Sequence, residues 1–224
     1  MQNLTAKKII EFKRLPPTRK QTFVNNLKKP IIKSDSGGDY WISCVSAITN
    51  ACKSNNSKII ADKIDFLQAQ YKASPFKRTK DMYQRNIDIL SGYKDYDFTK
   101  LKPKRITDFL TRPNPKHILT IKSLSVQVFP NHVFSYKNDN SDEVGAIWFV
   151  AQLNGFKNDE LQIFTELLYK YLSANYSKKR SINSNFCIAV DVVTKKEIKY
   201  SKIESSRENS ALDATLADLK TFLK

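Results

Sequence analysis

Hydrophobic positions in the first half of the chain recur every three or four residues, which is the spacing of amphipathic helices. This pattern predicts a helix over Ser43–Ala51 and a second helix that begins after Ser57 and ends at Ser74. A third helix is predicted over Met82–Leu90, and Gly92 provides its stop. The other sides of these helices carry Lys and Arg, so we expect the apolar sides to pack on a sheet formed later in the chain.

The hydrophobic pattern changes to that of β-strands after Ile118. The stretch Val144–Leu153 is apolar almost throughout, which is typical of a central strand covered by helices on both faces. The predicted strands are Ile121–Val128, His132–Tyr136, Val144–Leu153, Phe186–Val193 and Ile198–Ile203.

Two more helices are predicted in this strand-rich half. One begins at Asn158 or Asp159, and the other, Ala211–Leu223, closes the chain; the basic stretch Ser177–Asn185 is predicted to be a loop. This order predicts one α/β (α+β) domain, residues 1–224, with a mixed central β-sheet of about five strands flanked by helices. Residues 1–116 form a basic helical part, and residues 117–224 form a strand-rich core with a C-terminal helix.

Positive charge is concentrated in the first half of the sequence. The chain of 224 residues has a net charge of +16, of which +14 lies at or before Lys116 and +2 lies from His117 onward. Such asymmetry favours an anionic partner, with DNA or RNA first and a membrane surface second. Because most of the basic residues are Lys rather than Arg, the alternative is a merely Lys-rich surface with no such partner.

Three basic clusters are the candidate nucleic-acid-binding residues, and we expect them to converge on one face of the fold. Aromatic residues lie among the first two clusters, and if exposed they would suit a single strand, by base stacking beside phosphate neutralisation; the alternative is that these aromatics belong to the core. The candidates are Lys77, Arg78, Lys80, Arg85, Lys100, Lys102, Lys104, Arg105, Lys178, Lys179 and Arg180.

Cysteine and histidine usage predicts a reducing compartment and no metal centre. Cys44, Cys52 and Cys187 are dispersed in apolar stretches, which is neither a disulfide framework nor a zinc spacing. His117 and His132 are the only histidines, and both lie close to prolines at predicted strand edges. The N-terminus lacks the apolar region of a signal peptide, and no apolar run is long enough to span a membrane. We therefore expect a soluble, cytoplasmic protein without a cofactor.

The sequence has no phosphate-binding loop, no zincin motif and no hydrolase nucleophile elbow. The order of its predicted elements, however, matches that of a nuclease fold. Helix, three strands, helix and strand is the core of the PD-(D/E)XK, or restriction-endonuclease-like, fold. The stretch Pro130–Leu172 and the opening motif Gly37–Ile42 resemble a family of uncharacterised bacterial proteins with this arrangement. The resemblance implies a nuclease-like fold, in which acids would hold Mg²⁺ and a Lys would activate water.

The chain departs from that pattern at the catalytic positions. Asn131 stands where the pattern has an acid after Pro, and Ala146 and Trp148 stand where it has an acid and a Lys. The leading hypothesis is therefore a non-catalytic nucleic-acid-binding or accessory protein on an eroded nuclease-like fold. The alternatives are a Mg²⁺-dependent nuclease that uses relocated acids, with Asp191, Asp142 and Asn131 as candidates, and a protein-interaction module without a nucleic-acid role.

Overall fold

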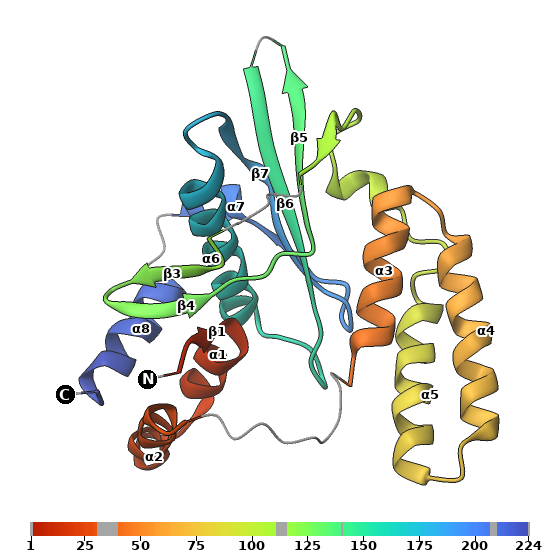
Figure 1. Cartoon of the computed structure of the whole chain (residues 1–224), viewed down its shortest axis with the longest axis horizontal. Coiled ribbons are helices and arrows are strands. Elements are labelled where there is room, and N and C mark those ends of the chain that lie inside the picture. The colour runs from red at the N-terminus through yellow and green to blue at the C-terminus, as the bar shows by residue number, and fades with distance from the viewer. Residues whose placement is uncertain (1, 31–39, 111–115, 140, 207–209, 224) are drawn as a thin grey trace.

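A five-stranded mixed sheet forms the centre of the protein, as the sequence predicts (Figure 1). The computed structural model describes residues 2–30, 40–110, 116–139, 141–206 and 210–223. The strand order is β2-β5-β6-β7-β8. The strands are β2 (Asp108–Phe109), β5 (His132–Asn138), β6 (Ser141–Val150), β7 (Ser181–Asp191) and β8 (Glu197–Lys199).

Strand β6 is the central strand, and helices cover both of its faces. β6 is antiparallel to β5 and parallel to β7, and helix α6 (Asn158–Tyr176) makes the connection between β6 and β7. Alternate residues enter separate cores: Ala146 faces α6, whereas Ile147 faces the helices on the opposite side. The nearly continuous apolar run therefore reflects burial on both faces, as expected.

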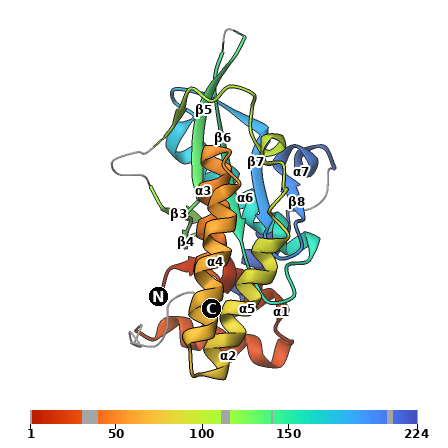
Figure 2. The same cartoon turned by 90° about the vertical axis from the view of Figure 1, so that its right-hand side faces the viewer.

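Three antiparallel helices form the layer opposite α6 (Figure 2). They are α3 (Ile42–Ser54), α4 (Lys58–Ala73) and α5 (Lys77–Ser91), and the short 3₁₀ helix η1 (Phe98–Leu101) follows them. The predicted helices at these places are confirmed. Their apolar sides pack on each other and on the sheet, with Ile48, Ile64 and Leu90 among the buried side chains.

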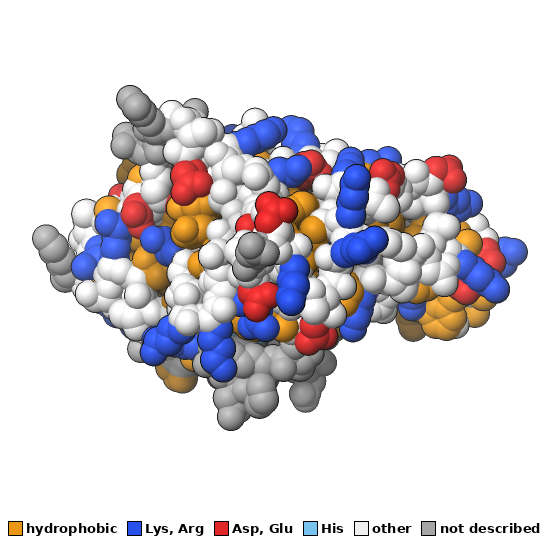
Figure 3. All heavy atoms as spheres, turned by 90° about the horizontal axis from the view of Figure 1, so that it is seen from above, with side chains coloured by type: hydrophobic (Ala, Val, Ile, Leu, Met, Phe, Trp, Pro, Cys, Tyr) orange, Lys and Arg blue, Asp and Glu red, His pale blue; other side chains and the backbone are white. Residues whose placement is uncertain are grey.

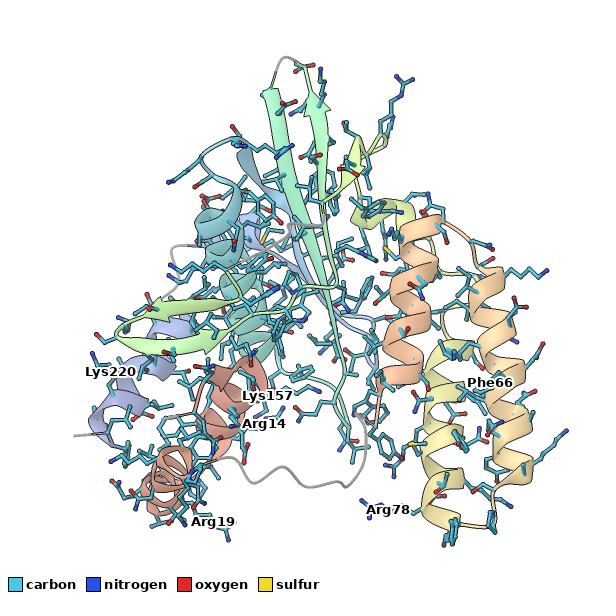
Figure 4. The ribbon with its side chains drawn as sticks, in the orientation of Figure 1. Arg14, Arg19, Phe66, Arg78, Lys157 and Lys220 are labelled. Atoms are coloured by element: carbon cyan, nitrogen blue, oxygen red, sulfur yellow. The ribbon has the colours of Figure 1, made fainter. Side chains whose placement is uncertain are left out.

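The N-terminal helices pack with the second half of the chain. Strand β1 (Leu4–Thr5) joins a separate three-stranded sheet, and α1 (Ala6–Arg14) and α2 (Pro17–Lys28) share one core with α6 and the C-terminal helix α8 (Ala211–Thr221). Arg14 lies beside the N-terminus of α6, close to Lys157 (Figure 4), and its guanidinium donates two hydrogen bonds of 2.6 Å to Glu160. Burial raises the pKa of Glu160, but Arg14 and the Lys157 backbone N–H outweigh it, so the net pKa is lowered.

Two predicted strands are wrong in detail. The expected single strand Ile121–Val128 belongs to a hairpin of β3 (Ile118–Ile121) and β4 (Leu124–Gln127), because Lys122 and Ser123 both adopt positive φ and reverse the chain. The expected strand Ile198–Ile203 is cut short.

The last strand of the sheet ends after three residues, where the chain turns into helix α7 (Tyr200–Ser206). The Tyr200 ring stacks on Tyr169 of α6 with 3.8 Å between ring centroids, which anchors the turn. The predicted loop before β7 is also shorter than expected, because β7 already begins at Ser181 and pairs there with Glu143.

Candidate nucleic-acid interface

The three predicted basic clusters do not converge on one face. Lys77, Arg78 and Lys80 lie in the first turn of α5, and Figure 4 shows Arg78 at the lower end of that helix. The segments around Lys104 and Lys178 lie at the opposite end of the molecule, where β5 and β6 form a hairpin (Figure 1). The α5 group is therefore spatially separate from the other two.

The α5 group is also engaged within the protein. The Lys80 ammonium lies 5.5 Å from the centroid of the Tyr71 ring, and the Arg85 guanidinium lies 5.7 Å from that of Tyr40. With Arg85, which also lies in α5, the α5 group has four basic residues, and these cation–π contacts engage two of them within the protein.

Lys102 is a structural residue rather than a ligand-binding one, which corrects its place among the candidates. It is buried, and its ammonium donates hydrogen bonds to the Cys52 carbonyl and, at 2.7 Å, to Asn55 Oδ1. Asn55 is the left-handed C-cap of α3, so Lys102 satisfies carbonyl and amide oxygens where that helix ends. Burial lowers the pKa of Lys102.

We expect Lys102→Met to lower the free energy of unfolding by about 2 kcal/mol, because it removes the hydrogen bond to Asn55 and leaves the buried Cys52 carbonyl without its Lys102 partner. Urea unfolding followed by circular dichroism measures the change. The matched control is Lys104→Met: Lys104 is exposed, and its loss should change stability by less than about 0.5 kcal/mol. Equal effects of the two substitutions would contradict the structural role of Lys102.

Lys100 lies in η1, and its ammonium is 4.4 Å from the centroid of the Tyr96 ring, so it contacts the helical layer rather than the hairpin. The other candidates flank the β5–β6 hairpin on both sides. We call the surface formed by Lys104, Arg105, Lys137, Lys178, Lys179 and Arg180 the hairpin surface. On one side, Lys104, Arg105 and Lys137 line a cavity of about 540 Å³ together with Tyr136 and Asn183.

The other side of the hairpin surface is a smaller cavity of about 290 Å³. Lys178, Lys179 and Arg180 line it, together with Asp108 and Leu110 from the segment around the edge strand β2. The Arg180 Nε is buried and has no hydrogen-bond acceptor among the residues that the structure describes.

Acidic residues lie on the hairpin itself. Glu143 accepts hydrogen bonds from the Tyr136 hydroxyl and from the side-chain amides of Asn138 and Asn183. Burial raises the pKa of Glu143, but these hydrogen bonds outweigh it and lower the net pKa, so the carboxylate is charged at neutral pH. Figure 3 looks down on this end and shows Lys and Arg side chains with acidic ones between them. The hairpin surface is thus two basic cavities separated by a polar, partly acidic ridge.

The candidate catalytic acids do not come together. Val150 pairs with Asp191, and Asp142 lies eight residues before Val150 on β6, so the two acids are about 26 Å apart along the sheet. Among the described residues, no group of three or more His, Cys, Asp or Glu side chains could hold a metal ion.

Asp191 has a structural explanation at the end of β7. Its Oδ2 accepts hydrogen bonds from the Phe156 backbone N–H at 2.9 Å and the Thr194 hydroxyl at 2.7 Å, and its Oδ1 accepts one from the Val193 N–H at 3.0 Å. The carboxylate is fully buried and ties the loop before α6 to the turn after β7. Gly155, with a φ of +72°, passes so close that any Cβ there would collide with Asp191.

The side chain of Asn131 is also engaged in a structural hydrogen bond with the backbone. Its Oδ1 accepts a hydrogen bond of 2.7 Å from the Phe149 N–H, where β6 extends beyond the start of β5. Asn131 and Trp148 line a cavity whose described lining residues include no Asp or Glu. The position where the PD-(D/E)XK pattern has its acids is therefore lined, in the described part of the chain, by aromatic, aliphatic and neutral polar side chains and by Lys7.

No family model, curated protein or solved structure matches the chain. The resemblance to the PD-(D/E)XK fold therefore stays a prediction from the sequence. Within the described ranges, no helix combines the length and the apolar character needed to cross a membrane.

Sequence reasoning missed Lys137 and the aromatic cavity. Lys137 is a lone basic residue at the exposed end of a strand, and only the hairpin geometry brings it beside Lys104 and Arg105. The signal for the cavity is that Trp41 and Trp148 are the only tryptophans of the chain, but they lie far apart in the sequence.

Proposed function

We propose that the chain binds nucleic acid without cleaving it, through the hairpin surface. The observation that carries this proposal is the pair of basic cavities on the two sides of the β5–β6 hairpin. Two phosphate-binding positions on either side of a ridge suit a flexible polyanion, which can follow both cavities, better than a compact anion, which fills one.

Electrostatics supports phosphate contacts rather than base-specific readout at this surface. Four of its six basic residues are Lys, which supply point charge without the planar fork that reads base edges. Arg105 and Arg180 supply the bidentate geometry that suits phosphate oxygens. We therefore expect binding with little sequence preference and a strong dependence on salt.

Equilibrium binding to fluorescein-labelled single-stranded DNA and RNA of about 20 nucleotides tests the proposal, by anisotropy at 50 mM and 200 mM salt. With about five phosphates contacted, the affinity for a single strand should fall roughly 100-fold between the two salt concentrations. No binding at 50 mM salt, or binding that salt does not weaken, would reject the proposal and favour a protein-interaction module.

Cleavage is the result that would favour the alternative nuclease. The same oligonucleotides, incubated with Mg²⁺ or Mn²⁺ and separated on a denaturing gel, should remain intact. Metal-dependent cleavage that Asp191→Ala or Asp142→Ala abolishes would establish the relocated-acid nuclease instead.

A further inference from the structure

The cavity at Asn131 is lined by aromatic side chains and is separate from the hairpin surface. Its volume is about 310 Å³, and it lies at the end of β6 away from the hairpin. We call it the tryptophan cavity, because both tryptophans of the chain line it. The lining residues that matter here are Trp41, Trp148, Phe129, Phe164, Asn131 and Gln127.

Trp148 is more exposed than its neighbours on strand β6. Residues Val144–Val150 of β6 are all buried except Trp148, which is half-buried. Its indole contacts the Phe164 ring edge-on, with 5.2 Å between centroids, so one part of the ring is fixed by the core while the rest faces the cavity. An indole held in place and partly open is a preformed stacking surface.

Phe129 provides a second open ring. Its side chain is 52% exposed although it is a large hydrophobic residue in an ordered segment beside β4. The ring lies 4.4 Å from that of His117, which holds it at the cavity wall. A planar apolar ligand between such walls would remove exposed aromatic surface from water.

The polar residues that line the cavity are Thr5, Lys7 and two residues with side-chain amides. Asn131 accepts a hydrogen bond from Phe149 through Oδ1, and its NH₂ donates none to the described residues, so it is an available donor. Gln127 adds a second amide, which can both donate and accept. The described lining residues include no acid that would repel a phosphate.

We propose that the tryptophan cavity binds a nucleobase, stacked on an aromatic wall and held at its polar edge by the side-chain amides. Aromatic stacking combined with amide hydrogen bonds is how proteins recognise unpaired bases. A base could come from a free nucleotide or from a nucleic-acid strand. In the second case the inference rests on the proposed function and adds a base-binding site to it.

Intrinsic tryptophan fluorescence is the direct probe, because every tryptophan of the chain lines this cavity. The protein is titrated with AMP, GMP, CMP and UMP up to about 1 mM, and separately with the single-stranded oligonucleotides. Saturable quenching by at least one mononucleotide or by an oligonucleotide is expected. Ribose 5-phosphate, which has no base, should cause none.

Two cavity variants test the assignment against a matched control. Trp148→Leu and Phe129→Leu should each weaken nucleotide binding roughly tenfold, measured by calorimetry, since each removes a stacking surface. Phe129 is half exposed, so Phe129→Leu keeps the test valid if Trp148→Leu does not fold. The control is Phe76→Leu, an exposed aromatic outside the cavity, which should bind as the unaltered protein does.

The outcomes separate this inference from the proposed function. No saturable quenching by any mononucleotide or oligonucleotide, or unchanged affinity in the folded cavity variants, would overturn the base-binding site. If anisotropy still shows salt-dependent oligonucleotide binding, the proposed function stands without it. Quenching by mononucleotides in a protein that binds no oligonucleotide would retain the cavity as a nucleotide site and reject the nucleic-acid surface.

Discussion

Oligonucleotide binding at 50 mM salt will weaken at least about 100-fold when five basic residues of the hairpin surface are replaced together by Gln. The five residues are Lys104, Arg105, Lys178, Lys179 and Arg180. These residues line the two cavities of the hairpin surface, and each phosphate contact that they lose removes the gain from counterion release. The variant should fold normally, because four of the five side chains are exposed, Arg180 is only half-buried, and none of the five forms an ion pair among those that the structure gives. Anisotropy measures the affinity, and circular dichroism checks the fold.

The matched control removes charge from α5 instead. This variant replaces the four basic residues of α5 by Gln: Lys77, Arg78, Lys80 and Arg85. It removes four positive charges rather than five, from a helix that lies away from the hairpin. Their loss should change the affinity by no more than about threefold, as expected for general electrostatic attraction. An α5 variant that binds as weakly as the hairpin variant would show that total charge, rather than the hairpin surface, determines binding.

Asp191→Ala will lower the free energy of unfolding by about 3 kcal/mol. The substitution leaves the Phe156 and Val193 N–H groups and the Thr194 hydroxyl without their acceptor in a fully buried place. Asp191→Asn should have an intermediate effect, because one oxygen remains while the new NH₂ faces a donor. Urea unfolding followed by circular dichroism gives the change.

The control for Asp191 is Asp142→Ala, in which the removed carboxylate is exposed and the stability should change by less than about 0.5 kcal/mol. Oligonucleotide affinity of the folded Asp191 variants should equal that of the unaltered protein. Unchanged stability of Asp191→Ala would contradict the role of this carboxylate as a clamp between two loops.

The parts of the fold that the sequence predicts are those with long, consistent patterns. Strand β6 and helix α6 were identifiable because the strand is buried on both faces and the helix repeats its apolar residues over several turns. The β3–β4 hairpin was not, since its strands have four residues each and its turn uses Lys122 and Ser123 at positive φ. Without Gly or Asn at these positions, the local sequence gives no turn signal.

The basic first half and the nearly neutral second half of the sequence do not form separate parts of the folded protein. Three basic residues of α1 and α2 form ion pairs with acids of the second half: Arg14 with Glu160, Lys13 with Asp159, and Lys20 with Asp218. The N-terminal excess of charge is therefore partly balanced by α6 and α8. Composition shows an excess of positive charge, but only tertiary packing shows where it remains uncompensated.

The candidate site was predictable only in part for the same reason. Lys178, Lys179 and Arg180 are adjacent in the sequence and stay together in the fold. Lys102 belongs to a basic run but is turned inward by the end of α3, which no local pattern indicates. Strand register decides that Lys137 joins the surface and that Asp142 and Asp191 are kept apart.

Lysine footprinting tests the location of the binding surface most directly. The protein is acetylated with and without saturating oligonucleotide, and labelling of each Lys is quantified by mass spectrometry. Bound oligonucleotide should protect Lys104, Lys137, Lys178 and Lys179 and leave Lys77 and Lys80 unchanged. Protection of Lys77 and Lys80 with full labelling of the hairpin surface would contradict the account.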